Sequence, residues 1–235
     1  MAAAQKFAAG TYFGPMNDIP EIHRLHHRAI ALDGRADDAQ RALASARDRL
    51  QRAVDDGRVL TASAFRYREH FFTYAECIGT PIAHEELFGE ITECTVWPDR
   101  HARFIPMMDI FHCGVPWTVD YWRRRAPIEK VEAHVIRIIP EKLASYIFYH
   151  YQLQEEQLGS FDKFAVIALN DNLLFYYKEH PFVVEPPLRP GTLQTKNTPD
   201  PWHPLMITHF QPWPDASGPE DYWRAIETLW TVGRE

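Results

Sequence analysis

Short motifs recur in the same order in the two halves of this 235-residue chain. The sequence FTYAE at residues 72–76 is echoed by FYYKE at 175–179, and DYWR at 120–123 recurs letter for letter at 221–224. The two intervals are nearly equal, at 103 and 101 residues (175 − 72 and 221 − 120). Looser echoes pair residues 19–21 with 139–141 and 107–112 with 205–210. Intervals of this length exceed those of solenoid repeats and predict a duplicated domain.

Hydrophobic periodicity and turn residues give the two predicted halves a similar order of elements. In the first half, residues 1–126, we expect strands at 11–16, 60–67, 71–77 and 103–113, and helices from residue 19 and over 37–54, 85–91 and 118–125. In the second half, residues 127–235, we expect strands at 131–139, 164–169, 173–179 and 205–210, and helices from residue 140 and over 221–230. A proline-rich stretch, 181–204, is predicted to be irregular.

Each predicted half is an α+β unit with an antiparallel sheet and its helices on one face. The other face of such a sheet is apolar and needs a cover. Two sheets in one chain can cover each other, so the sequence predicts a barrel-like core between the halves. The helix at 37–54 is an addition to the first half without a counterpart in the second.

Composition narrows the classes of partner. The net charge is −7, which argues against a nucleic-acid backbone as the main ligand. The three isolated cysteines, Cys77, Cys94 and Cys113, form no CxxC pair and suit a reducing compartment. The first residues lack the apolar core of a secretory signal, and no stretch approaches the ~18–20 apolar residues of a membrane helix. We expect a cytoplasmic protein without a membrane or nucleic-acid partner.

The second half carries a pair of polar aromatic residues on one helix face. Tyr146 and His150 are four residues apart in the helix that begins at Pro140. A two-strand hairpin follows, with Asn170-Asp171-Asn172 as its turn. This arrangement resembles the L-rhamnose mutarotase family, whose members have a ferredoxin-like fold and pair as a dimeric α/β barrel. The resemblance implies tandem ferredoxin-like repeats that form an internal pseudo-dimer.

The same resemblance implies a site. Mutarotation needs one group to take the proton of the anomeric hydroxyl and another to protonate the ring oxygen, and a neutral histidine suits either role. His150, Tyr146 and Glu179 are the candidate catalytic residues of the second half, and Trp202 and Tyr177 are the candidate substrate-binding residues. The adjacent tryptophan pair of the family is absent. The alternative is that Tyr146 is a core residue, Glu179 ends an exposed strand and Trp202 plugs the barrel rim.

The first half offers a weaker version of this set. His27 and Glu76 are its candidate catalytic residues, and His23 and Trp97 its candidate substrate-binding residues. On a helix, His23 and His27 would share a face and, with Glu76 and His112, would suit Zn or Fe. HxxxH alone is a weak signal, and a solvated helix face is the preferred interpretation, so we expect neither a metal nor another cofactor.

These observations favour an enzyme that acts on a small polar or carbohydrate-like molecule by acid–base chemistry, as a mutarotase or related isomerase. Two alternatives stay open. One is a cyclase, isomerase or metal- or haem-dependent oxygenase of natural-product or aromatic metabolism, because barrels of this type support many chemistries. The other is a non-catalytic small-ligand-binding module. A monomer and a homodimer are both compatible with the sequence, and it names no substrate.

Overall fold

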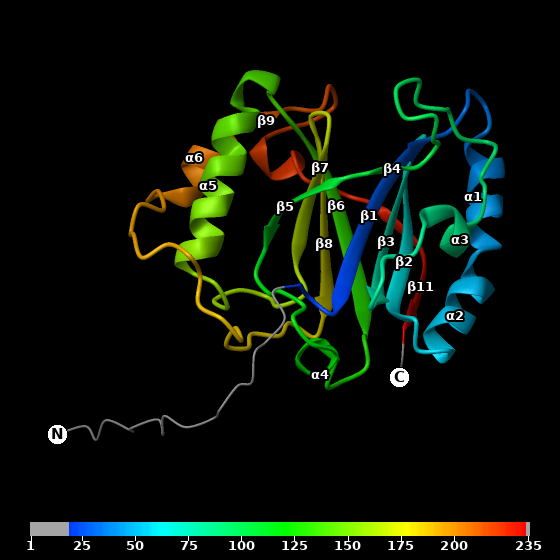
Figure 1. Cartoon of the computed structure of the whole chain (residues 1–235). Coiled ribbons are helices and arrows are strands. Elements are labelled where there is room, and N and C mark those ends of the chain that lie inside the picture. The colour runs from blue at the N-terminus through cyan, green and yellow to red at the C-terminus, as the bar shows by residue number, and fades with distance from the viewer. Residues whose placement is uncertain (1–18, 234–235) are drawn as a thin grey trace.

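The computed structural model describes residues 19–233, which fold into two antiparallel β-sheets with helices on their outer faces (Figure 1). The α+β class is therefore confirmed. The predicted strand at 11–16 lies outside the described residues.

The first sheet has the strand order β11-β2-β3-β1-β4. Its strands are β1 (Ile22–Ile30), β2 (Val59–Tyr67), β3 (His70–Ile78), β4 (Ile105–Pro106) and β11 (Glu227–Gly233). The second sheet has the order β10-β6-β8-β7-β5, and β9 also pairs with β6. Its strands are β5 (Met108–His112), β6 (Lys130–Ile138), β7 (Val166–Asn170), β8 (Leu173–His180), β9 (Phe210–Gln211) and β10 (Arg224–Ala225).

Each half of the chain contributes one strand to the other half's sheet. β5 comes from the first half but pairs with β7 in the second sheet. β11 comes from the end of the chain but pairs with β2 in the first sheet. The orders β11-β2-β3-β1-β4 and β5-β7-β8-β6-β9 are then equivalent. In each sheet, a hairpin lies between the strand contributed by the other half and the first strand of the sheet's own half.

A buried core lies between the sheets. Strand alternation places Phe72 and Tyr74 of β3 on the inner face of the first sheet, and Phe175 and Tyr177 of β8 on the inner face of the second. Phe72 stacks on Phe175 with ring centroids 5.1 Å apart, and Tyr74 stacks on Tyr177 at 4.0 Å. The echoed segments 72–76 and 175–179 therefore meet face to face.

The inner layer ends in a buried ion triad formed by Glu76, Arg124 and Glu179. Arg124 Nη2 donates to Glu76 Oε1 at 2.9 Å and to Glu179 Oε1 at 2.6 Å, and its Nε donates to Glu179 Oε2 at 2.9 Å. Tyr74 and Tyr177 donate their hydroxyls to the adjacent carboxylates, and Trp122 Nε1 donates to Glu76 at 2.8 Å. Each carboxylate thus has both a charge partner and hydrogen bonds, as buried charges require.

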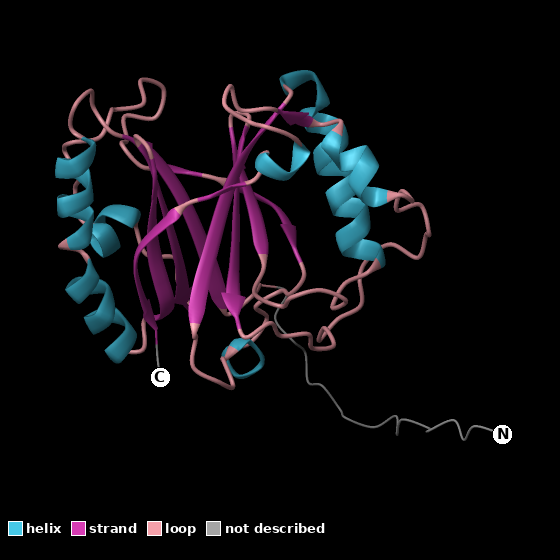
Figure 2. Cartoon of the chain, turned by 180° about the vertical axis from the view of Figure 1, so that it is seen from behind, coloured by secondary structure: helices cyan, strands magenta, loops and turns pink. Residues whose placement is uncertain are grey.

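Helices cover the outer faces of both sheets (Figure 2). The first sheet is covered by α1 (Ala36–Ala44), α2 (Arg47–Asp55) and α3 (His84–Phe88), and the second by α5 (Leu143–Glu156) and α6 (Trp202–Ile207). The short α4 (Val119–Trp122) lies at one end of the sheets, and single 3-10 turns occur at Pro140–Lys142 and Pro219–Asp221. Within residues 19–233, none of these helices has the length and apolarity needed to cross a membrane.

The segment from residue 19, predicted as a helix, is strand β1. Apolar residues at Ile22, Leu25 and Ala29 imitate helical spacing. The true period is two, with Leu25 and Ala29 toward the helices and the polar His26 buried between the sheets. Buried polar side chains on the inner face concealed the alternation.

Two predictions near the C-terminus are also wrong. Residues 205–210 form the end of α6 and the start of β9 instead of a strand, and residues 221–230 contain β10 and most of β11 instead of a helix. Trp230 and Val232 alternate along β11 and are buried, which is the strand period that the helix prediction missed. The helix predicted at 37–54 is present as two helices, α1 and α2.

Only one of the four sequence echoes falls on equivalent elements, namely 72–76 on β3 and 175–179 on β8. Residues 120–123 follow β5, whereas 221–224 precede the equivalent strand β11. Residues 19–21 precede β1, whereas 139–141 follow β6, and 107–112 and 205–210 have different secondary structures.

Because the two sheets cover each other within one chain, we expect a folded monomer at low concentration. Light scattering of the purified protein measures this directly. A dimer that persists at nanomolar concentration would contradict the expectation.

Candidate functional site

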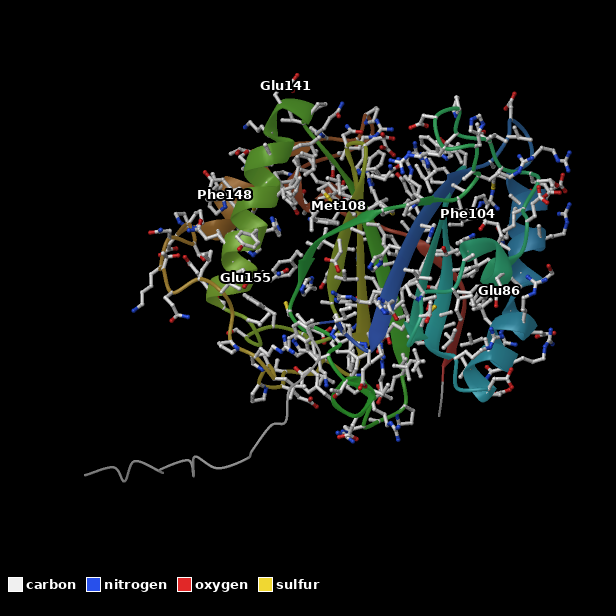
Figure 3. All side chains as sticks on the ribbon, viewed as in Figure 1. Glu86, Phe104, Met108, Glu141, Phe148 and Glu155 are labelled. Atoms are coloured by element: carbon white, nitrogen blue, oxygen red, sulfur yellow. The ribbon has the colours of Figure 1, made fainter. Side chains whose placement is uncertain are left out.

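A cavity of about 640 Å³ lies between the outer face of the second sheet and the helices α5 and α6. Its walls are mainly aromatic and aliphatic, with Phe111 and Tyr176 from the sheet, Tyr146 and Leu153 from α5, and Trp202 from α6. Helix α5 forms one wall of the cavity. Figure 3 labels Glu141, just before α5, and Glu155, near its end. The volume falls within the range of pockets that hold drug-sized ligands.

His150 and Tyr146 enter this cavity from α5. Their ring centroids are 4.0 Å apart, as expected for residues one helical turn apart. His150 is 5% exposed, and its Nδ1 lies 3.0 Å from the backbone oxygen of Tyr146. A carbonyl oxygen only accepts, so Nδ1 carries the proton and Nε2 carries the lone pair.

Burial keeps His150 neutral. It lowers the pKa of His150 to about 4, against the hydrogen bond to Tyr146, which raises it, and with a smaller lowering effect of His209. The imidazole is therefore unprotonated at neutral pH and can accept a proton through Nε2. Burial also raises the pKa of the Tyr146 phenol far above its ordinary value, so that Tyr146 stays protonated.

Aromatic rings hold His150 in place. Trp202 and Phe111 meet its ring edge to face, with centroids 5.0 and 5.4 Å away. Trp202 is the first residue of α6 and ends the irregular stretch that was predicted over 181–204. The structure thus brings together three predicted site residues, His150, Tyr146 and Trp202.

Sequence reasoning missed His134 and Tyr176, which line the floor of the cavity. They are register partners on β6 and β8, with ring centroids 6.2 Å apart. Alternation along the predicted strand 131–139 places His134 on the same face as the buried Ile136, and this was the signal available to find it.

Tyr177 and Glu179 are not in this cavity. They lie on the inner face of β8 and belong to the inter-sheet core and the ion triad, because successive residues of a strand point to opposite faces. Glu76 occupies the matching position on β3 and is fully buried beside Arg124. The structure therefore separates these three residues from His150.

The two predicted site histidines of the first half, His23 and His27, also lie apart from each other. On a strand, His23 and His27 are about 13 Å apart, too far to share a metal ion. His27 packs against His84 of α3 with ring centroids 4.6 Å apart, and burial lowers the pKa of His27 to about 4. His23 lines a separate surface hollow with His112. No group of three potential metal ligands occurs among residues 19–233.

The outer face of the first sheet carries closely packed rings, and a smaller hollow of about 310 Å³ beside α3 is lined by His84 and Phe104. His84 stacks on Phe88 and Phe104, and Phe88 stacks on Trp230. Phe104, labelled in Figure 3, lies close to α3. Trp97 lies in the loop before β4, with Arg28 over its ring at 5.6 Å, and does not reach a cavity that resembles that of the second half.

Comparisons with known proteins identify no family. No family model and no curated protein matches the chain. Among solved structures, the chain is similar to a protein from Fusobacterium nucleatum named "Putative monooxygenase", with 10% sequence identity over 71% of this chain and 78% of that one. The TM-score of 0.36 is too low to support an argument about fold or function.

Proposed function

We propose that the protein is an enzyme that binds a flat, largely apolar small molecule in the cavity of the second half and acts on it by acid–base chemistry. This corresponds to a cyclase, isomerase or related enzyme of natural-product or aromatic metabolism. The observation that carries the proposal is the neutral His150, whose Nε2 has no hydrogen-bond partner among residues 19–233 and whose ring lines an aromatic cavity.

The lining supports this ligand class over a sugar. A monosaccharide presents hydroxyl groups on all sides, and each must be matched by a hydrogen-bonding group when it leaves water. The cavity is lined mainly by rings and aliphatic chains. Its hydrogen-bonding groups belong to His134, His150, His203 and Glu220 and to the aromatic residues Tyr146, Tyr176, Trp202 and Trp223. Flat apolar ligands gain from such walls through burial and ring stacking.

The resemblance to the mutarotases remains a hypothesis about ancestry. We propose that residues 1–126 and 127–235 are diverged ferredoxin-like copies that form an internal pseudo-dimer of the dimeric α/β-barrel type. The equivalent strand orders of the two sheets and the pairing of segments 72–76 and 175–179 across the core support this proposal.

Calorimetric titration tests the ligand class. We expect 2-naphthol, a flat aromatic alcohol, to bind and L-rhamnose not to bind. Trp202→Ala should weaken 2-naphthol binding about 10-fold, since the loss of one ring contact costs ~1.4 kcal/mol. Trp97→Ala is the matched control from the first half and should leave binding unchanged. Binding of L-rhamnose that depends on His150, without binding of 2-naphthol, would contradict the proposal and favour the mutarotase hypothesis.

A non-catalytic binding module is the second candidate, because a cavity of this kind can bind a ligand without catalysing a reaction. It would bind the same aromatic probes but would not move a proton on them. Proton exchange on a bound ketone, described below, separates the two.

A further inference from the structure

We propose that His134 is a second catalytic residue, which acts opposite His150 as a hydrogen-bond donor, and that the ligand is a neutral, flat carbonyl compound with an acidic C–H beside its carbonyl group. This inference rests on the proposed function. It names the chemical class of the substrate and a residue that sequence reasoning did not find.

The two histidines approach the cavity from different walls. His150 comes from α5, and His134 comes from β6 on the outer face of the second sheet, next to Tyr176 of β8. Both side chains line the same cavity, so a ligand that fills it lies between the two walls.

Their proton positions are complementary. His150 carries its proton on Nδ1 and presents the lone pair of Nε2 to the cavity. In His134 it is Nδ1 that is buried without a hydrogen-bond partner. A buried N–H without a partner is rarer than an unpaired acceptor, which favours the tautomer with the proton on Nε2. The two histidines therefore offer one acceptor and one donor.

This pair suits transfer of a proton next to a carbonyl group. Nε2 of His150 takes the proton of the C–H, and the electron pair of that bond moves into the carbonyl to form an enolate. The Nε2–H of His134 donates a hydrogen bond to the enolate oxygen. His150 then returns the proton to the same carbon, or to a conjugated carbon in an isomerisation. Atoms and electrons balance without an oxidant, reductant or metal.

The surroundings of both rings favour their neutral forms. Burial lowers the pKa of His134. Glu132 raises this pKa, whereas Lys178 and Lys130 lower it further. His203 and Glu220 also line the cavity, and His209 packs against Tyr146 beside His150. A neutral base and a neutral donor match a ligand without net charge.

The test uses 2-tetralone, a flat ketone with acidic C–H groups beside its carbonyl. Its binding is measured by calorimetry, and exchange of its acidic protons in D₂O is followed by NMR at saturating protein. We expect exchange well above that in buffer. His150→Leu should slow it about 10²–10⁴-fold, and His134→Leu about 10²–10³-fold. His134→Gln should retain part of the rate, because the amide keeps a donor.

The outcomes are distinguishable. Failure of 2-tetralone and 2-naphthol to bind would overturn the proposed function and this inference together. Binding with exchange equal to that in buffer would leave a non-catalytic binding module, and would overturn the acid–base part of the proposed function together with this inference. An unchanged exchange rate in a folded His134→Leu protein would overturn the role of His134. His23→Leu is the control, since His23 lies outside the cavity, and it should exchange like the unmodified protein.

Discussion

Replacement of Arg124 by methionine should lower the free energy of unfolding by about 3–5 kcal/mol at pH 7. Arg124 is the cation shared by Glu76 and Glu179, whose side chains are 0% and 2% exposed. Without it, the two buried carboxylates lose the cation that they share. Chemical denaturation of both proteins, followed by circular dichroism, measures the difference.

The effect should depend on pH in a defined direction. Burial alone would raise the pKa of Glu76, but Arg124 and the hydrogen bonds from Tyr74 and Trp122 hold it below its ordinary value. A lowered pKa stabilises the fold above the unfolded-state pKa, and this contribution is lost as the pH falls through the folded-state value. In Arg124→Met the unpaired Glu76 carboxylate takes up a proton instead, so the difference between the proteins should shrink below about pH 4.

Two variants control this experiment. Arg125→Ala removes an exposed neighbouring arginine and should change stability by less than about 0.5 kcal/mol. The triple variant Glu76→Gln, Arg124→Met, Glu179→Gln removes all three charges and keeps acceptors for Tyr74 and Tyr177. It should recover most of the lost stability. Equal destabilisation by the single and triple variants would show that packing, and not charge, is the origin of the effect.

Trp230→Ala should lower the free energy of unfolding by about 3–5 kcal/mol, the usual range for a buried large aromatic residue. Trp230 is 7% exposed, stacks on Phe88 at 6.0 Å and donates Nε1–H to the Leu43 oxygen at 3.3 Å. Its loss leaves a cavity in the first-half core although the residue lies near the end of the chain. Thermal or urea denaturation measures the loss.

Glu227→Ala is the matched control on the same strand, because Glu227 is exposed, and it should be nearly neutral. A small effect of Trp230→Ala would contradict the placement of β11 in the first sheet.

The α+β class and the two central hairpins could be predicted from the sequence. Apolar and β-branched runs around Asn170-Asp171-Asn172 define β7 and β8, since local turn chemistry and strand period agree there. The helix with Tyr146 and His150 was also predicted, from its polar start at Pro140 and the helical spacing of the two residues. β1 could not be predicted because its inner face carries His26 and Arg28, polar residues that only the inter-sheet contacts bury.

The site was predicted in part. His150, Tyr146 and Trp202 meet because helix spacing fixes the first two and the chain after residue 181 returns to them. Glu179 and Tyr177 were assigned to the same site because the hairpin was known but the face of β8 that points toward α5 was not. A shift of one residue along a strand reverses the face, so the neighbouring Tyr176 lines the cavity instead.

The strands β5 and β11, each contributed to the other half's sheet, also determine when the protein can fold during its synthesis. β2 can pair with β11 only after about 160 further residues have been synthesised. The first sheet therefore cannot close until β11 leaves the ribosome. The usual order, in which an N-terminal domain folds before the next is made, is therefore unavailable here. Until then the edge of β2 has unpaired backbone groups, which can pair with strands of other chains. Separately expressed halves, each missing the strand that the other carries, should fold only when they are mixed.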